Sequence, residues 1–170
     1  MTRIPLVTDK AGLSESQTAA FDAVVASRGS LLRPFQLLVH RPAIAHHSAA
    51  LGATIRFESQ MRDADRELVI LATAADHGCG FEWDHHLEIA TRAGVRAEAI
   101  EVLRGGAGAL HEWELVLVNF ARELCRTASV SDETFTAAHE VLGHAGIVEL
   151  AAIVGYYTML AYVMGACDAC

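Results

Sequence analysis

The residues best suited to chemistry lie close together in the chain. Cys79, Glu82 and His86 fall within eight residues, directly after Gly78, which can end a helix. If the next helix begins near Cys79, a rotation of about 100° per residue brings Glu82 and His86 within roughly 60° of it. Glu67 lies on the preceding helix and is expected to fold back toward this face. A thiol, an imidazole and carboxylates gathered in this way can move protons.

The side chains between these residues are expected to lie outside the shared face. His85 points well away from it, and Trp83 and Leu87 point elsewhere around the helix. Asp84 and His85 are therefore expected to be solvated. On the residues alone, an ordinary half-polar helix face is the alternative interpretation of the cluster.

The spacing of Glu67, Cys79, position 82 and His86 resembles the signature of the carboxymuconolactone decarboxylase and AhpD-like superfamily. The peroxidase branch of that superfamily carries Cys-x-x-Cys-x-x-x-His, and here Glu82 stands in place of the second cysteine. The run from Phe81 to His86 is similar instead to the decarboxylase branch, where an aromatic residue, Glu and Trp precede the histidine. The resemblance extends from about residue 31 to residue 106, with a weaker match at 155–157.

The resemblance implies a fold, an activity and an assembly. The fold is all-α, an AhpD-like helical domain in which a central antiparallel helix pair carries the motif. The activity is that of a cofactor-free lyase or isomerase, which uses acid–base chemistry on a small carboxylated lactone or a related enolisable acid. The assembly is a homo-oligomer, a trimer or a hexamer. No cofactor and no metal are expected.

Each residue of the motif has an expected role in such a reaction. His86 is the natural general acid, because the ordinary pKa of histidine lies near neutrality. Glu82 can orient His86 or exchange protons itself, and Glu67 can orient His86 from the neighbouring helix. Cys79 is then a small wall of the site or a minor donor.

Two other functions remain open. The first is a thiol peroxidase or redox protein, in which Cys79 attacks and a second thiol, from Cys125 or the C-terminal Cys167 and Cys170, resolves the sulfenic acid. The absence of a cysteine at position 82 argues against it. The second is a non-catalytic helical oligomer that keeps the fold without the activity.

Composition and charge limit the partners. The 170 residues suit one domain, 1–170, and 52% of them are hydrophobic. A net charge of −8 argues against nucleic acid and anionic membranes, so a small-molecule substrate is expected. An acidic substrate needs a local arginine, for which Arg41 and Arg56 are candidates. Residues 1–10 show no secretory signal, so a cytoplasmic protein with reduced thiols is expected. The Cys-x-x-Cys formed by Cys167 and Cys170 at the C-terminus is expected to be incidental.

The pattern along the chain is helical throughout, with no alternating strand pattern. Residues 150–167 are an uncharged run long enough to span a membrane, with Glu149 at its edge, and a buried or interfacial helix is the expected explanation. The histidines lack the spacing of a helical zinc site. The expected helices are 14–29, one beginning at 31–34, one opening at 41–42, 63–75, 79–94, 97–103, 111–127, 131–143 and 147–165.

Overall fold

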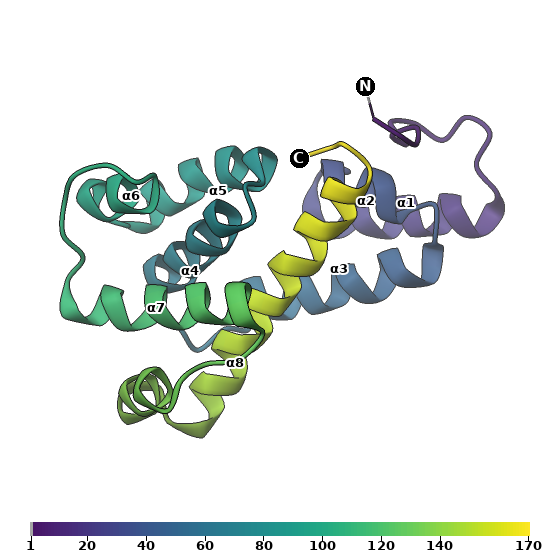
Figure 1. Cartoon of the computed structure of the whole chain (residues 1–170). Coiled ribbons are helices and arrows are strands. Elements are labelled where there is room, and N and C mark those ends of the chain that lie inside the picture. Colours follow the sequence, from purple (N-terminus) through teal and green to yellow (C-terminus); the bar gives the residue numbers. More distant parts are fainter. Residues whose placement is uncertain (1) are drawn as a thin grey trace. The chain divides into compact units, whose positions relative to one another are not determined.

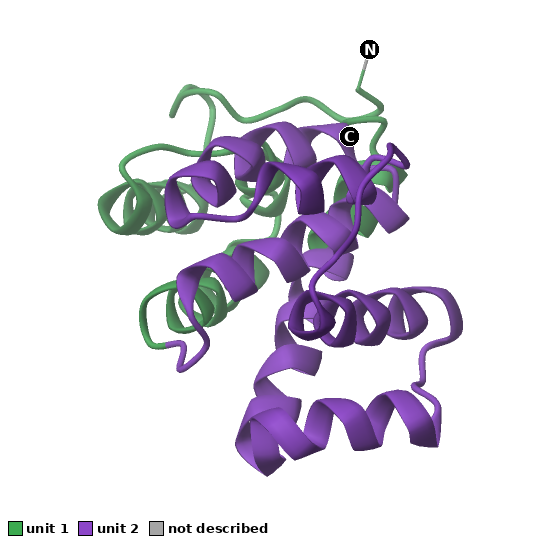
Figure 2. Cartoon of the chain, turned by 90° about the vertical axis from the view of Figure 1, so that its left-hand side faces the viewer, with its two compact units in different colours: residues 1–58, 160–170 green, residues 59–159 purple. Residues whose placement is uncertain are grey.

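The computed structural model describes residues 2–170, which form eight helices and no strand (Figure 1). The all-α prediction is therefore confirmed. The chain divides into two compact units (Figure 2). The first unit contains the residues up to 58 together with 160–170, and the second contains residues 59–159. The single domain expected from the length of the chain stays a prediction.

The first unit contains three helices that begin and end where local signals require. Ser14 and Gln17 form a capping box at the first helix, which ends at Gly29 in the left-handed conformation (φ 78°), both as predicted. Pro42 is the first residue of the third helix, also as predicted. The helices are α1 (Glu15–Arg28), α2 (Arg33–Leu38) and α3 (Pro42–Phe57).

The buried face of α3 differs from the expected one. The pattern predicts Ile44, Leu51 and Ile55 as its apolar positions, but Ile44 and Leu51 are each 47% exposed, and only Ile55 is buried. The face that packs is made of small residues, because α3 lies against α1 and α2. Besides Ile55 it consists of Ala45, Ser48, Ala49 and Gly52.

The second unit is arranged around one helix, α4, which contacts α5, α6 and α7 (Figure 1). Ten consecutive residues of α4, from 65 to 74, are buried, so the charged residues at its start are enclosed with the apolar ones. The helices of this unit are α4 (Asp63–Asp76), α5 (Gly80–Ala93), α6 (Ala97–Leu103), α7 (Glu112–Thr127) and α8 (Asp132–Ala166), of which the last few residues belong to the first unit.

Two details of these helices correct the sequence-based expectation. Asp63 is not the cap of α4 but its first helical residue, and its carboxylate pairs with Arg66 at 2.9 Å. On α7 the helical period predicts Leu115, Val118 and Leu124 as the apolar positions; Val118 is buried, Leu124 is half-buried and Leu115 is 46% exposed. The buried face, Leu117, Val118, Phe120 and Ala121, is rotated away from Leu115 because it is the face in contact with α4.

The long helix α8 is interrupted where the sequence predicts a helix end. Gly143 has φ 63° and ψ −174°, which is not helical, so the segment is two helices in succession. By length and composition alone α8 could cross a membrane, with a mean hydropathy of 1.7. However, Leu150, Ile153 and Val154 are fully or almost fully buried, as in the core helix of a soluble protein.

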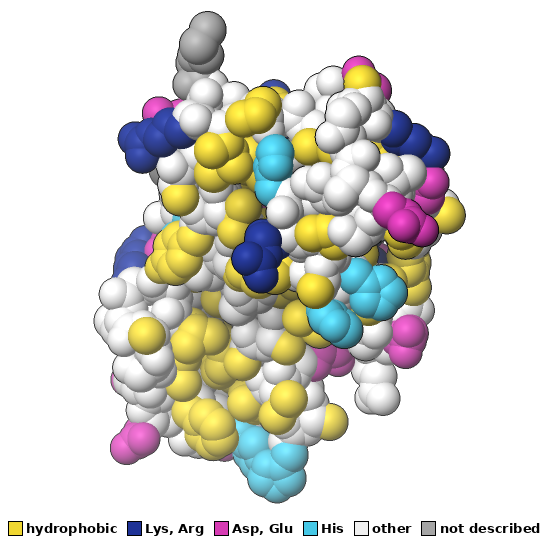
Figure 3. Space-filling model, turned by 90° about the vertical axis from the view of Figure 1, so that its right-hand side faces the viewer, with side chains coloured by type: hydrophobic (Ala, Val, Ile, Leu, Met, Phe, Trp, Pro, Cys, Tyr) yellow, Lys and Arg dark blue, Asp and Glu magenta, His cyan; other side chains and the backbone are white. Residues whose placement is uncertain are grey.

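Several large hydrophobic side chains remain at the surface. Figure 3 shows hydrophobic side chains reaching the surface among histidine and positively charged side chains on the face that it draws. The most exposed in the second unit are Val148 at 70% and Val141 at 57%, both on α8.

Candidate functional site

The motif is placed by a tight turn between α4 and α5. Gly78 takes the left-handed conformation, with φ 61°, and Cys79 is the N-cap of α5. This is the helix boundary that the sequence predicts. At its other end α5 stops at Gly94, also left-handed with φ 91°, as expected. The antiparallel pair α4 and α5 therefore carries the motif.

The predicted shared face exists and is buried. Cys79, Glu82 and His86 are 1%, 3% and 4% exposed, and with Ala90 they form a continuous inward stripe on α5. Asp84 is exposed, as expected. His85 is not fully solvated, because it is only half-exposed and its ring stacks parallel to that of Phe81 at 6.0 Å.

His86 lies between two buried carboxylates. Its Nδ1 is 2.7 Å from Oε2 of Glu67, which does fold back from α4 toward the motif. A carboxylate can only accept a hydrogen bond, so Nδ1–H donates to Glu67 and this fixes the tautomer of the ring. The opposite nitrogen, Nε2, lies 3.6 Å from Oε2 of Glu82, one helical turn away. The imidazole is thus held on one side and available for proton exchange on the other.

Two further side chains complete the surroundings of His86. Arg66 is 7% exposed, and its Nε lies 3.7 Å from Glu67 Oε1, so a positive charge offsets part of the cost of burying the carboxylates. The ring of Tyr157, on α8, meets the His86 ring edge-on at 5.0 Å. Sequence analysis did not assign either role. The signal for Arg66 is a charge directly beside Glu67 at the start of an apolar run.

A hollow of about 370 Å³ opens beside Cys79 within the second unit. Trp83 lines it together with Cys79 and Gly80, so the expectation that Trp83 points elsewhere is wrong. The reason is that Trp83 is one turn beyond Cys79 on α5, which places it on the adjoining side of the helix. The other side chains that line the hollow come from the end of α4 and the end of α6, and include Arg104.

The arginine in this hollow is not one that sequence analysis considered. Arg41 and Arg56 both belong to α3 and its cap in the first unit, where Arg56 stacks on Phe57. Arg104 follows α6, in the same unit as the motif. A partner for a substrate carboxylate could not be chosen from sequence, because which arginine meets the motif depends on how α6 packs on α4.

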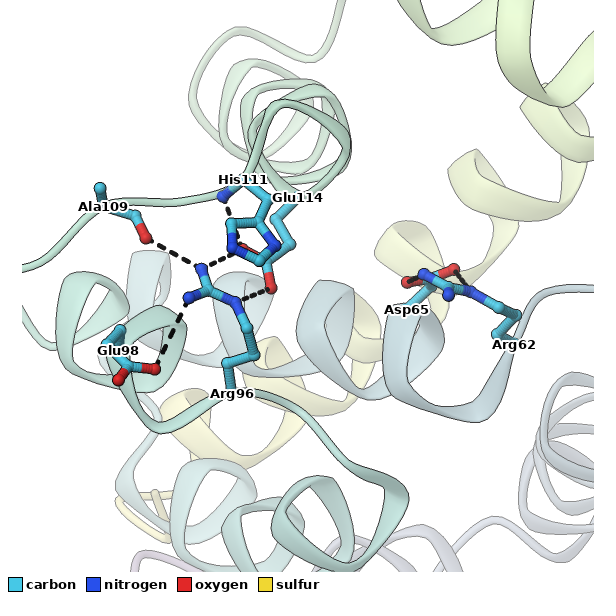
Figure 4. A network of polar contacts seen from close by, with 7 residues as sticks. All are labelled: Arg62, Asp65, Arg96, Glu98, Ala109, His111 and Glu114. Atoms are coloured by element: carbon cyan, nitrogen blue, oxygen red, sulfur yellow. Dashed lines mark hydrogen bonds and ion pairs between the residues drawn. The ribbon is translucent and has the colours of Figure 1, made fainter.

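A second and larger hollow of the same unit, about 580 Å³, lies away from the motif. Figure 4 shows its polar groups, in which Arg62 pairs with Asp65 and Arg96 pairs with Glu114. The paired guanidinium of Arg96 lowers the pKa of Glu114. Since each arginine is already matched with a carboxylate, this hollow offers little attraction for an anion, and the motif remains the better candidate.

Among residues 2–170, no three histidine, cysteine or carboxylate side chains are grouped as a metal ion would require. The absence of a cofactor stays a prediction. The arrangement around His86 consists of proton donors and acceptors, which suits acid–base chemistry.

Comparison with known proteins places the motif in a family context. Residues 42–123 match the sequence model of the carboxymuconolactone decarboxylase family. The fold matches the crystal structure of an uncharacterized peroxidase-related protein from Ralstonia eutropha JMP134, described as an alkylhydroperoxidase AhpD core. That likeness has a TM-score of 0.78 and 18% sequence identity, and it covers 99% of this chain and 91% of the other. No curated protein matches the chain.

Proposed function

We propose that this chain, of which residues 42–123 match the carboxymuconolactone decarboxylase family, is a lyase or isomerase that needs no cofactor. Its substrate is a small carboxylated lactone or a related enolisable acid. The general acid is His86, Glu67 orients it, and Glu82 exchanges protons with it. Cys79 forms part of the wall of the site.

The observation that supports this proposal is that the two nitrogens of the His86 ring lie at different distances from their carboxylate partners. Glu67 accepts from Nδ1 at 2.7 Å, whereas Glu82 lies 3.6 Å from Nε2, just beyond hydrogen-bond distance. A small movement of either side chain lets a proton pass between Nε2 and Glu82. The second cysteine that a two-thiol peroxidase needs within this motif is replaced by that carboxylate.

The proposed reaction releases one molecule of carbon dioxide and takes up one proton. As the carboxylate leaves as carbon dioxide, the electron pair of the broken carbon–carbon bond moves into the neighbouring carbonyl and forms an enolate. His86, which carries a proton on both ring nitrogens at this stage, then delivers the Nε2 proton to carbon and keeps the Nδ1 proton, and the carbonyl is restored. Glu82 or solvent returns a proton to His86. The substrate has exchanged its carboxylate for a hydrogen, and no oxidant or reductant is consumed.

The test is turnover of a panel of carboxylated lactones by the wild-type protein, His86→Ala and Cys79→Ala, followed as carbon dioxide release and product formation. We expect His86→Ala to lower kcat by about 10²–10⁴-fold, the usual contribution of a general acid. Cys79→Ala is expected to weaken turnover only. The exposed His47 of α3 provides the matched control, since His47→Ala removes an imidazole without touching the site.

Equal tolerance of the His86 and Cys79 substitutions would eliminate this mechanism. If no lactone is turned over, a non-catalytic helical oligomer becomes the better description.

A second function, a thiol peroxidase, is favoured by one observation: Cys79 is at the N-terminus of α5 and lines a hollow. Cys79 and Cys170 are both disulfide-bonded in this structure, contrary to the expectation of reduced thiols. Once an external dithiol has reduced its disulfide, the Cys79 thiolate would attack a peroxide oxygen and release an alcohol or water. A second thiol would then displace water from the sulfenic acid, and an external dithiol would reduce the disulfide. Cys125 is poorly suited as the second thiol, because burial raises the pKa of its side chain.

Peroxide consumption with a dithiol reductant separates the two functions. If Cys79→Ser alone abolishes consumption, and mass spectrometry of the reduced protein finds that peroxide restores a disulfide that depends on Cys79, the peroxidase replaces the lyase. If no variant consumes peroxide, Cys79 is not a peroxidatic nucleophile.

A further inference from the structure

We infer that Arg104 binds the carboxylate of the substrate. The ring of the substrate then lies in the hollow beside Trp83. The inference rests on the proposed function for its place in the reaction, but binding itself can be tested without turnover. The ligand class is a small cyclic, unsaturated monocarboxylate.

The hollow has the size and lining that such a ligand requires. Its volume of about 370 Å³ lies at the small end of the range of about 300–1,000 Å³ that is usual for ligand sites. Ala74, Ala75 and Leu103 give it apolar walls, and Trp83 gives it an aromatic one. Arg104 is the charged side chain of this lining. An apolar body with one anionic group matches this distribution.

Arg104 is held in place without being neutralised. Its guanidinium lies over the Trp83 ring, 5.3 Å from the ring centre, which orients the planar group. Its other contact is an ion pair with Glu101 at 3.6 Å, and the two side chains are 44% and 54% exposed. An ion pair as exposed as this contributes little, so a carboxylate in the hollow can compete with Glu101 for the guanidinium.

The contrast with the larger hollow supports this choice of arginine. There Arg62 and Arg96 each make two hydrogen bonds of 2.7–2.9 Å to one carboxylate, so a ligand would have to break a bidentate pair. The single contact of 3.6 Å between Arg104 and Glu101 imposes no such requirement.

The hollow also adjoins the motif at Cys79. Arg104 and Cys79 line the same hollow, and Cys79 belongs to the buried stripe of α5 that continues with Glu82 and His86. A ring held between Trp83 and the start of α5 would therefore meet the motif at Cys79. Arg104 acts here as a binding residue, and the proton chemistry remains with His86.

The test is equilibrium binding of benzoate, with its neutral isostere benzamide for comparison, read through the fluorescence of Trp83. The chain has two tryptophans, so Trp113→Phe leaves Trp83 as the single reporter. In this background we expect saturable quenching by benzoate, and a Kd at least about tenfold higher in Arg104→Gln. Arg104→Lys is expected to recover part of the affinity, because it keeps the charge but not the planar fork.

Arg92→Gln is the matched control, because Arg92 is an exposed arginine of α5 and the substitution makes the same change in net charge. Its benzoate Kd should equal that of the parent. Equal Kd values for Arg104→Gln and Arg92→Gln, equal binding of benzamide and benzoate, or no saturable benzoate binding would each overturn the inference.

Kinetics then separate this inference from the proposed function. On a lactone that is turned over, Arg104→Gln should raise KM with kcat largely kept, whereas His86→Ala should lower kcat. Benzoate binding that depends on Arg104, without any turnover that depends on His86, would support the site and refute the lyase. The opposite pattern would retain the lyase and reject Arg104.

Discussion

At the scale of single residues, His86 is defined by the different distances of its two carboxylates. The Glu67 contact of 2.7 Å is a charge-assisted hydrogen bond, and it orients the ring. The Glu82 contact of 3.6 Å is looser and leaves Nε2 free to exchange a proton. A thiol at position 82 could form a disulfide and the carboxylate of Glu82 cannot, which is why the proposed chemistry is acid–base rather than thiol chemistry.

Replacing Glu67 tests the orienting role. Glu67→Gln keeps the size of the side chain but removes the charge that stabilises Nδ1–H, so the Nε2–H tautomer becomes accessible. We expect turnover to fall by about 10–100-fold, the usual effect of losing a residue that orients a functional histidine. Nitrogen NMR of the His86 imidazole should show a smaller fraction of the Nδ1–H form.

The control for that measurement is Glu88→Gln, which makes the same chemical change at an exposed position of α5. An unchanged tautomer and unchanged turnover in Glu67→Gln would show that Glu67 is only a structural bracket between α4 and α5.

At the scale of elements, the site depends on the turn that joins α4 to α5. Gly78 takes φ 61°, a conformation that other residues adopt only with strain, and it directly precedes Cys79. This turn reverses the chain so that the start of α4 comes alongside α5 and brings Glu67 to His86. Local backbone conformation thus sets a contact between residues 19 positions apart.

Substitutions of two neighbouring glycines test the turn. Gly78→Ala places a Cβ in the left-handed region, where it costs about 1 kcal/mol. In a chain of this size we expect the melting temperature to fall by about 2–4 °C. Gly80→Ala is the matched change, because Gly80 is the first residue of α5 with ordinary backbone angles and open space around it.

Thermal unfolding followed by circular dichroism gives the comparison. Gly80→Ala should leave the melting temperature unchanged or raise it, since alanine favours the helix. Equal melting temperatures in the two variants would contradict the role assigned to Gly78.

At the scale of the whole molecule, the fold alone does not decide the reaction. The chain shares its architecture with a peroxidase-related protein at 18% identity, while residues 42–123 match a decarboxylase family. A likeness of fold does not fix the reaction, so the proposed chemistry is argued from the side chains at the start of α5.

We also propose that the chain is a homo-oligomer. Val148 and Val141 on α8 are 70% and 57% exposed, which is a cost for a monomer that a second copy would remove. Light scattering after gel filtration should give a multiple of 18.2 kDa. Val148→Glu should shift the mass toward the monomer, because it places a charge in an apolar contact.

Thr136→Glu is the matched control, an added carboxylate at another exposed position of α8. A monomeric wild type, or the same mass in both variants, would rule out an interface at Val148.

The sequence by itself determined what depends on neighbours along the chain. The all-α class, the helix ends at Gly29, Gly78 and Gly94, and the shared face of Cys79, Glu82 and His86 were all predictable. These features follow from the helical period and from the conformational freedom of glycine, which act within a few residues.

Only the tertiary structure decided which faces are buried and which residues meet. The burial of α3 and α7 was misjudged, because it depends on the helices that pack against them. The same holds for Arg104, which follows α6 and yet lines one hollow with Cys79 and Trp83 of the α5 segment. Contacts of this kind are made by packing between elements, which the periodicity of a single helix does not encode.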